Sequence, residues 1–230
     1  MQKALTLTET GIGKKVLVAV TGAMLFGWLI VHLVGNLQIF LGADHINEYS
    51  EFLQGLPKLV WATRIILLIA VLVHMYLTIE LAMRNRAART ARYAVVRDAG
   101  EQSPLMRYAR KTMVLSGPII GFFIAFHIAH LTVGADVIPG YEFQHLHPYE
   151  NMVYGFRNPL VAGLYMTATL LIGLHIFHGG QSLFQSLGLR HPQWDPRSRG
   201  AAAALAVFIT IGNLSIPLSV LSRLVGGELP

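Results

Sequence analysis

Five long apolar stretches constrain the fold of this chain more than any other feature of its sequence. They cover residues 16–41, 59–83, 112–135, 159–187 and 201–222. A helix needs roughly 20 residues to cross the apolar core of a bilayer, and each stretch is long enough. Because backbone polar groups in lipid must bond within their own segment, such stretches form helices. The sequence therefore predicts an all-α membrane protein with five transmembrane helices, forming a single domain over residues 1–230.

Composition excludes the main alternatives to a membrane protein. Charged residues make up 13% of the chain and hydrophobic residues 53%, and the mean hydropathy is +0.52. A soluble domain has about 25% charged residues, so this chain lacks the polar surface to cover a soluble core. It has no cysteine, which excludes disulfides, thiolate zinc sites and thiolate iron–sulfur sites.

Positive charge is distributed unevenly between the segments that join the five stretches. With the N-terminus in the cytoplasm, 14 of the 18 lysines and arginines fall in cytoplasmic segments, and Lys58, Arg64, Arg157 and Arg223 fall on the other side. Cytoplasmic loops are enriched in these residues. We therefore expect a multi-pass protein of the inner (cytoplasmic) membrane, with the N-terminus inside and the C-terminus outside. The net charge of +6 then reflects topology and not nucleic-acid binding.

Histidine is unusually frequent for so apolar a chain. Six of the ten histidines lie inside the predicted spans, namely His32, His74, His127, His130, His175 and His178. The other four, His45, His145, His147 and His191, fall in predicted loops. A histidine in a membrane helix is costly and marks a functional site. One such residue could simply bond a neighbouring helix, but here each of the first four spans has at least one.

Imidazoles from four helices, without thiolates or carboxylates beside them, suit haem iron. A b-type haem takes two axial imidazoles from facing helices, so one ligand on each of four helices predicts two haems. Zinc and copper also accept histidine, although their ligands usually gather at one depth. At 1.5 Å of rise per residue, His32 and His127 both lie in the outer half of their spans. His74 lies nearer the inside, and its pairing with His175 follows by elimination.

Two of the helices offer a choice of ligand. On one helix, His127 and His130 are three residues apart and therefore share roughly one helix face. The same holds for His175 and His178 on another helix. Spacing does not choose between them. On each of these helices, the histidine that does not bind iron would form a hydrogen bond with a haem propionate, a quinone or a backbone carbonyl.

Two glycines lie at matching positions in the first and third spans. Gly22 and Gly117 stand ten residues before His32 and His127, about 15 Å toward the inside. Small residues there would leave room for the inner haem. Ordinary helix packing is the alternative, because Gly117 and Gly121 also form a small-xxx-small motif.

Several motifs surround these histidines. They are Gly-Lys-Lys at 13–15, His-Leu-Val-Gly-Asn at 32–36, His-Ile-Ala-His at 127–130, Tyr-Gly-Phe-Arg-Asn-Pro at 154–159, and the His-Ile-Phe-His-Gly-Gly segment within 173–188. With these motifs, the sequence resembles the di-haem cytochrome b subunit (the b558 type) of succinate:quinone oxidoreductases and the related fumarate reductases. The resemblance covers nearly the whole chain.

The resemblance implies specific iron ligands, one on each of the first four helices. The outer haem would be held by His32 and His127, and the inner haem by His74 and His175. On the third helix the family pattern uses the first histidine of the two, and on the fourth it uses the histidine four residues before Gly179. His130 and His178 would then be secondary residues of the haem pockets, as would the glycines at positions 22 and 117.

The resemblance also implies a function. The chain would anchor a flavoprotein subunit and an iron–sulfur subunit on the cytoplasmic face of the membrane. It would be the non-flavin subunit of a succinate dehydrogenase, in which succinate is oxidised in a partner. Electrons would pass through two haem b groups to a membrane quinone, which in this branch is commonly menaquinone. The arginine-rich segment from Arg84 to Lys111 would dock the partners, unless its charge reflects topology alone.

The quinone site is less well specified. Candidate residues are Glu48, Tyr49 and Arg64, which follow His32 on the outer side, although ordinary loop polarity would also explain them. Glu80 is expected to form an ion pair near Arg84 at the membrane boundary.

Two alternative functions follow from the same sequence. One is the cytochrome b subunit of another quinone-linked complex, such as a fumarate reductase, hydrogenase or formate dehydrogenase. In the last two, the partners would lie on the opposite face of the membrane. The other is a haem-free transporter or structural anchor whose histidines only pack helices.

Overall fold

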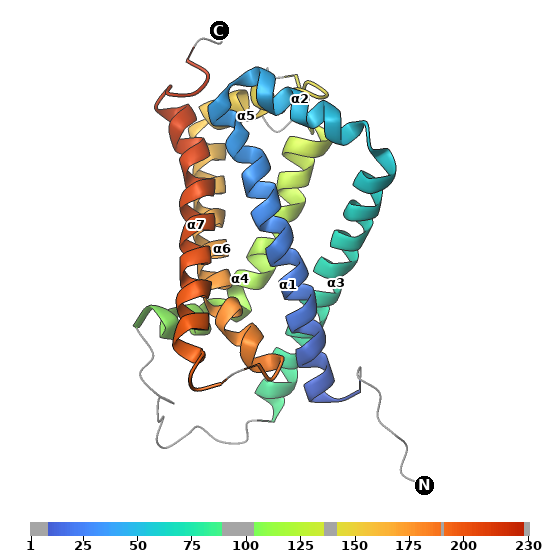
Figure 1. Cartoon of the computed structure of the whole chain (residues 1–230), viewed down its shortest axis with the longest axis vertical. Coiled ribbons are helices and arrows are strands. Elements are labelled where there is room, and N and C mark those ends of the chain that lie inside the picture. The colour runs from blue at the N-terminus through green and yellow to red at the C-terminus, as the bar shows by residue number, and fades with distance from the viewer. Residues whose placement is uncertain (1–8, 89–103, 136–141, 190, 228–230) are drawn as a thin grey trace.

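The computed structural model describes residues 9–88, 104–135, 142–189 and 191–227, and these residues form helices and short connections without a strand. Five long helices run side by side (Figure 1): α1 (Gly11–Asn36), α3 (Pro57–Ala87), α4 (Pro104–Ile128), α6 (Pro159–Ser186) and α7 (Asp195–Leu221). A 3-10 turn, η1 (Leu37–Leu41), extends α1, and a π-helical turn, η2 (Ala129–Val133), extends α4. All five are long and apolar enough to cross a membrane, which confirms the predicted all-α membrane protein with five spans.

The helix ends differ from the predicted spans by several residues. Helix α1 begins at Gly11 instead of residue 16, because the Thr10 side chain accepts a hydrogen bond from the Gly13 amide and caps the helix. In the same way Asn158 caps α6 through the amides of Leu160 and Val161. Hydropathy locates the segment in lipid, whereas capping side chains decide where the helix begins.

Two further helices lie where the sequence predicts loops, so that part of the prediction is wrong. Helix α2 (Ala43–Gln54) contains His45, and α5 (Pro148–Arg157) begins directly after His147. Both lie across one end of the bundle (Figure 1). They are amphipathic and too short to cross a membrane, so hydropathy does not reveal them. Each buries one face, through Ile46 in α2 and through Tyr149, Met152, Val153 and Phe156 in α5.

The bundle therefore has two distinct ends. We call them the N-terminal end, where α1 begins, and the covered end, where α2 and α5 lie. Eight basic residues whose side chains the structure describes lie in helical turns at the N-terminal end: Lys14, Lys15, Arg84, Arg86, Arg107, Lys111, Arg197 and Arg199. Lys58, Arg64, Arg157 and Arg223 lie toward the covered end. Which end faces the cytoplasm stays a prediction.

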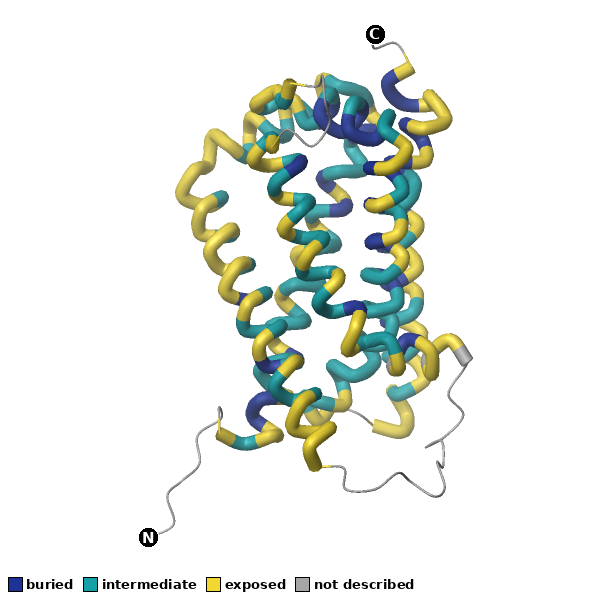
Figure 2. The backbone as a smooth tube through the Cα atoms, turned by 180° about the vertical axis from the view of Figure 1, so that it is seen from behind, coloured by how far each residue is buried: buried dark blue, intermediate teal, exposed yellow. Residues whose placement is uncertain are grey.

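Small residues allow the helices to approach closely, as is usual in membrane bundles. Helix α7 packs chiefly on α6, with Gly173 of α6 directly against Thr210 of α7. It also touches α1, where a Cβ atom at Gly212 would lie 2.8 Å from Leu33 Cδ2. Figure 2 shows the outcome, with buried residues concentrated at the covered end and along α6 and α7, and exposed residues prevailing on α3.

A cluster of three charged residues joins α1 to α3 near the N-terminal end. The predicted pair is present, with Arg84 Nη2 2.6 Å from Glu80 Oε1. The Lys14 ammonium group donates to the same oxygen, and the Lys14 side chain is only 6% exposed. Lys14 is thus a second partner of Glu80, on another helix. The sequence spacing within one helix does not predict this contact.

Replacing Lys14 by Met should destabilise the contact between α1 and α3. The Glu80 carboxylate would lose a charged hydrogen-bond partner but keep Arg84, so we expect the free energy of unfolding to fall by more than in the control below. Unfolding of the purified chain in mixed micelles measures this change. Lys15→Met is the matched control, because Lys15 is exposed and should change stability by less than about 0.5 kcal/mol. Equal losses in the two variants would contradict the role of Lys14.

Candidate functional site

Two pairs of histidines face each other between the helices. In the first pair, His32 of α1 and His127 of α4 have ring centres 5.7 Å apart and planes at 86°. In the second pair, His74 of α3 and His175 of α6 have ring centres 6.4 Å apart and planes at 61°. The structure thus brings together His32 and His127, which depth along the helices pairs, and His74 and His175, which were paired by elimination. Their role as iron ligands stays a prediction.

The two pairs lie at different levels of the bundle. Gly22 of α1 is beside the second pair, since a Cβ atom there would be 3.1 Å from His74 Cε1. His32 of the first pair follows Gly22 by ten residues on the same helix, which is about 15 Å of helix rise. The first pair is therefore nearer the covered end, and the second is nearer the N-terminal end.

The spacing within each pair fits an iron held by two axial imidazoles. A metal–imidazole bond is about 2 Å long, so two imidazoles on opposite sides of one iron have ring centres about 6 Å apart. The observed separations, 5.7 and 6.4 Å, are close to this value. Among the described residues, no group of three or more histidine, aspartate or glutamate side chains gathers around one point.

Hydroxyl groups from neighbouring helices contact the second pair. Thr21 Oγ1 of α1 lies 3.1 Å from His74 Nδ1. Ser116 Oγ of α4 lies 3.3 Å from His175 Nδ1, and Ser116 is buried. Both contacts use the ring nitrogen nearer the backbone, which leaves Nε2 at the tip of each ring for a ligand.

The first pair has different surroundings. His32 stacks with Trp28, and its Nε2 lies 3.1 Å from the Asn36 amide nitrogen one turn along α1. His127 Nδ1 is buried and has no hydrogen-bond partner within the described ranges. Aromatic rings of Phe123 and Tyr165 pack around His127.

His130 packs against Tyr165, whose ring also contacts His127 of the first pair. It lies in the π-helical turn η2 and is 4% exposed, and its Nδ1 is 2.9 Å from the Tyr165 hydroxyl. Its Nε2 points at Gly155 of α5 and, in the part of the chain that the structure describes, is buried without a partner. A π-helical turn inserts an extra residue and shifts the side chains that follow, often at functional sites.

His178 is also tied to its own helix. Ser182 Oγ lies 3.3 Å from His178 Nε2 and donates to the His178 carbonyl at 3.0 Å. The ring of His175, one turn earlier, lies opposite His74. This geometry favours His175 over His178 as the member that faces another helix.

The predicted glycine positions differ in what surrounds them. Gly22 allows the His74 ring to lie against α1. Gly117 has no atom within 4 Å of its would-be Cβ, so a side chain there would meet open space. Gly121 receives Met75 of α3, whose Cε would be 2.8 Å from an added Cβ. Helix packing thus explains Gly121, while room for a macrocycle at Gly117 stays a prediction.

The three quinone candidates do not form a single cluster. Tyr49 of α2 packs on Gly35 of α1, close to the first pair, with its Cε1 3.1 Å from a would-be Cβ. Glu48 is exposed, and Arg64 of α3 lies over the Trp61 ring at 5.3 Å. No hydrogen bond or ion pair joins Glu48, Tyr49 and Arg64 within the described residues. Of the three, Tyr49 is the one that packs on α1 near a predicted ligand, because Gly35 follows His32 by three residues.

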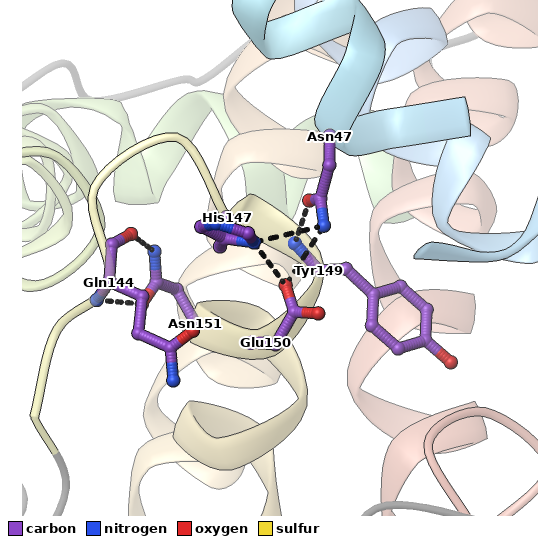
Figure 3. Close-up of polar contacts among 6 residues, drawn as sticks. All are labelled: Asn47, Gln144, His147, Tyr149, Glu150 and Asn151. Atoms are coloured by element: carbon purple, nitrogen blue, oxygen red, sulfur yellow. Dashed lines mark hydrogen bonds and ion pairs between the residues drawn. The ribbon is translucent and has the colours of Figure 1, made fainter. Parts of the chain in front are cut away.

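A polar network at the covered end was missed by reading the sequence. The Asn47 side chain accepts from the Tyr149 amide at 3.2 Å and donates to Glu150 Oε2 at 3.0 Å, which joins α2 to α5 (Figure 3). His147 Nδ1 lies 3.6 Å from the same carboxylate oxygen. About a hundred residues separate Asn47 from its partners, so no local motif indicates this contact.

Comparison of the chain with protein-family models, with curated proteins and with solved structures gives no match. The residues and their geometry are therefore the basis for assigning a function.

The close approach of Gly155 to His130 gives a stability prediction. In Gly155→Ala the new Cβ would lie 2.8 Å from His130 Cε1, so the ring must shift away from Tyr165. Overpacking of this kind costs about 1–3 kcal/mol, partly offset by the higher helix propensity of alanine. Gly163→Ala in α6 is the control, because a Cβ there meets no atom within 4 Å. Unfolding in mixed micelles should show a clear loss only for Gly155→Ala, and similar stability of both variants would contradict the contact.

Proposed function

We propose that this chain is the membrane anchor and electron-transfer subunit of a succinate:quinone oxidoreductase, with two haem b groups. The observation that supports it is the arrangement of two histidine pairs, on four helices and at two levels, with ring centres 5.7 and 6.4 Å apart. When bound, haem iron supplies one-electron redox chemistry. In this function, electrons arrive from an iron–sulfur subunit at the N-terminal end and leave to a membrane quinone, for which menaquinone is our candidate.

The protein's own contribution is to hold and orient the imidazoles in an apolar setting. Helices α1, α3, α4 and α6 each provide one ring, and α7 supports α1 and α6 from outside through Gly212 and Thr210. This packing supports two of the helices that bear the rings, and all four histidines are half-buried. Apolar shells and hydrogen bonds around axial ligands set the redox potential of an iron centre.

The basic N-terminal end is the proposed docking surface for a flavoprotein subunit and an iron–sulfur subunit. Lys15, Arg84, Arg86, Arg107 and Lys111 are exposed there. The positive-inside rule would place this end in the cytoplasm, and the C-terminus would then be outside. For the quinone we favour the covered end, near Tyr49, because that residue packs on Gly35, three residues after His32 on α1.

Purification of the full chain from its own membranes tests this function. We expect a b-type absorption band in the reduced-minus-oxidised spectrum, reduction of that band by succinate, and co-purification of a flavoprotein and an iron–sulfur protein. Absence of the band would support a haem-free membrane protein. Reduction by hydrogen or formate, but not by succinate, would support the cytochrome b of another quinone-linked complex.

Substitution of single histidines tests the two pairs. His32→Leu and His127→Leu should each lose the same haem, and His74→Leu and His175→Leu should each lose the other, because each iron would lack one axial ligand. The haem-to-protein ratio and low-temperature spectra measure this loss. His130→Leu and His178→Leu are matched controls on the same helices and should retain both haems. Two haems retained in His175→Leu would refute its assignment as a ligand.

A further inference from the structure

We propose that Thr21 and Ser116 are positioning residues that fix the protons of His74 and His175 on Nδ1. This leaves Nε2 of each ring as the metal-binding nitrogen and lowers the redox potential of the group that the second pair holds. The inference deepens the proposed function and rests on it. It assigns a role in redox tuning to two hydroxyl groups that belong to no motif in the sequence.

The Thr21 hydroxyl has only one hydrogen, and the backbone already accepts it. Oγ1 donates to the Leu17 carbonyl at 2.8 Å, with the Val18 carbonyl at 3.2 Å as its alternative acceptor. A hydroxyl that donates in this way can only accept from another neighbour. His74 Nδ1 lies 3.1 Å from the same oxygen, and His74 also hydrogen-bonds the Val18 backbone. With the hydroxyl hydrogen directed to the backbone, we assign Nδ1 as the donor that bears the proton.

Ser116 has the same arrangement on a different helix. Its Oγ donates to the Met113 carbonyl at 3.3 Å and lies 3.3 Å from His175 Nδ1. Ser116 is 3% exposed, so water does not compete for the hydroxyl. Helix α1 thus orients the ring on α3, and α4 orients the ring on α6. Both rings of the second pair are fixed in the same tautomer from outside their own helices.

The tautomer decides which nitrogen binds metal and how strongly it donates electrons. A neutral imidazole has one N–H, so a proton on Nδ1 leaves the lone pair on Nε2. Donation from Nδ1–H to an oxygen raises the basicity of the ligand nitrogen. A more basic ligand stabilises the oxidised metal, which lowers the redox potential.

The first pair lacks this arrangement at one of its two rings. His127 Nδ1 is buried with no acceptor in the described part of the chain, and the Asn36 amide approaches His32 at Nε2. The two centres are therefore held in different hydrogen-bond environments. Loss of a hydroxyl should change the second centre and leave the first as it was.

Potentiometric titration of the complete chain tests the inference, with one series of variants. Thr21→Val keeps the shape of the side chain and removes the hydroxyl, which leaves the Val18 backbone as the remaining partner of His74. Ser116→Ala removes the hydroxyl beside His175, and Thr21→Ser restores a hydroxyl at position 21. Thr167→Val is the matched control, because its hydroxyl donates to the Gly163 carbonyl at 2.8 Å on an exposed face of α6. We expect two haems in every variant and an upward shift of one potential in Thr21→Val and Ser116→Ala. Thr21→Ser and Thr167→Val should match the unchanged chain.

The centre that shifts must be the one that His74→Leu and His175→Leu remove. A shift of the other centre, an equal shift of both, or none would overturn the inference while the presence of two haems still supports the proposed function.

Nitrogen-15 spectra of histidine-labelled, full-length protein prepared without haem supply a second readout. The signals of His74 and His175 are identified as those that change in Thr21→Val and Ser116→Ala. In the unchanged chain, we expect these signals to show the Nδ1–H tautomer. The Nε2–H tautomer at those signals would overturn the inference whether or not the protein binds haem.

Discussion

The placement of neutral imidazoles inside an apolar helical bundle is the constraint on which the rest of the structure depends. A polar ring in such surroundings is costly unless its nitrogens have partners. Thr21, Ser116 and Tyr165 meet part of this need, because each contacts a histidine from another helix. His127 Nδ1 and His130 Nε2 are buried without a partner among the described residues. These contacts fix the relative positions of α1, α3, α4 and α6, so the histidines also decide how the bundle is assembled.

Close packing and the histidine pairs depend on each other. Gly22 lets the His74 ring approach α1, and Gly155 does the same for His130 under α5. On the other side of the bundle, the contacts of α7 with α6 and α1 are equally close, although α7 provides no histidine. In lipid, association of helices relies on such packing and on interhelical hydrogen bonds, since apolar burial alone gives little advantage. The fifth helix therefore supports α1 and α6, two of the four helices that bear the rings.

Much of the fold could be predicted because it follows from local sequence properties. Length and hydropathy give the five spans, and a rise of 1.5 Å per residue places His32 and His127 at one depth. Helices α2 and α5 could not be found in this way, because they are short and half polar, and they are stabilised by contacts such as that of Asn47 with Glu150. Helical spacing also did not choose between His127 and His130, and the resemblance alone implied His127.

The sequence by itself determined the class of protein, the number of spans, the asymmetry of positive charge and the helices that bear histidine. These properties depend on the composition and periodicity of each segment. Only the tertiary structure decided which side chains from different helices meet. It brought Lys14 to Glu80, Thr21 to His74 and Ser116 to His175, and it placed the rings of each pair opposite one another. Such contacts depend on the rotation and tilt of packed helices, which arise from small residues and side-chain shape across the whole bundle.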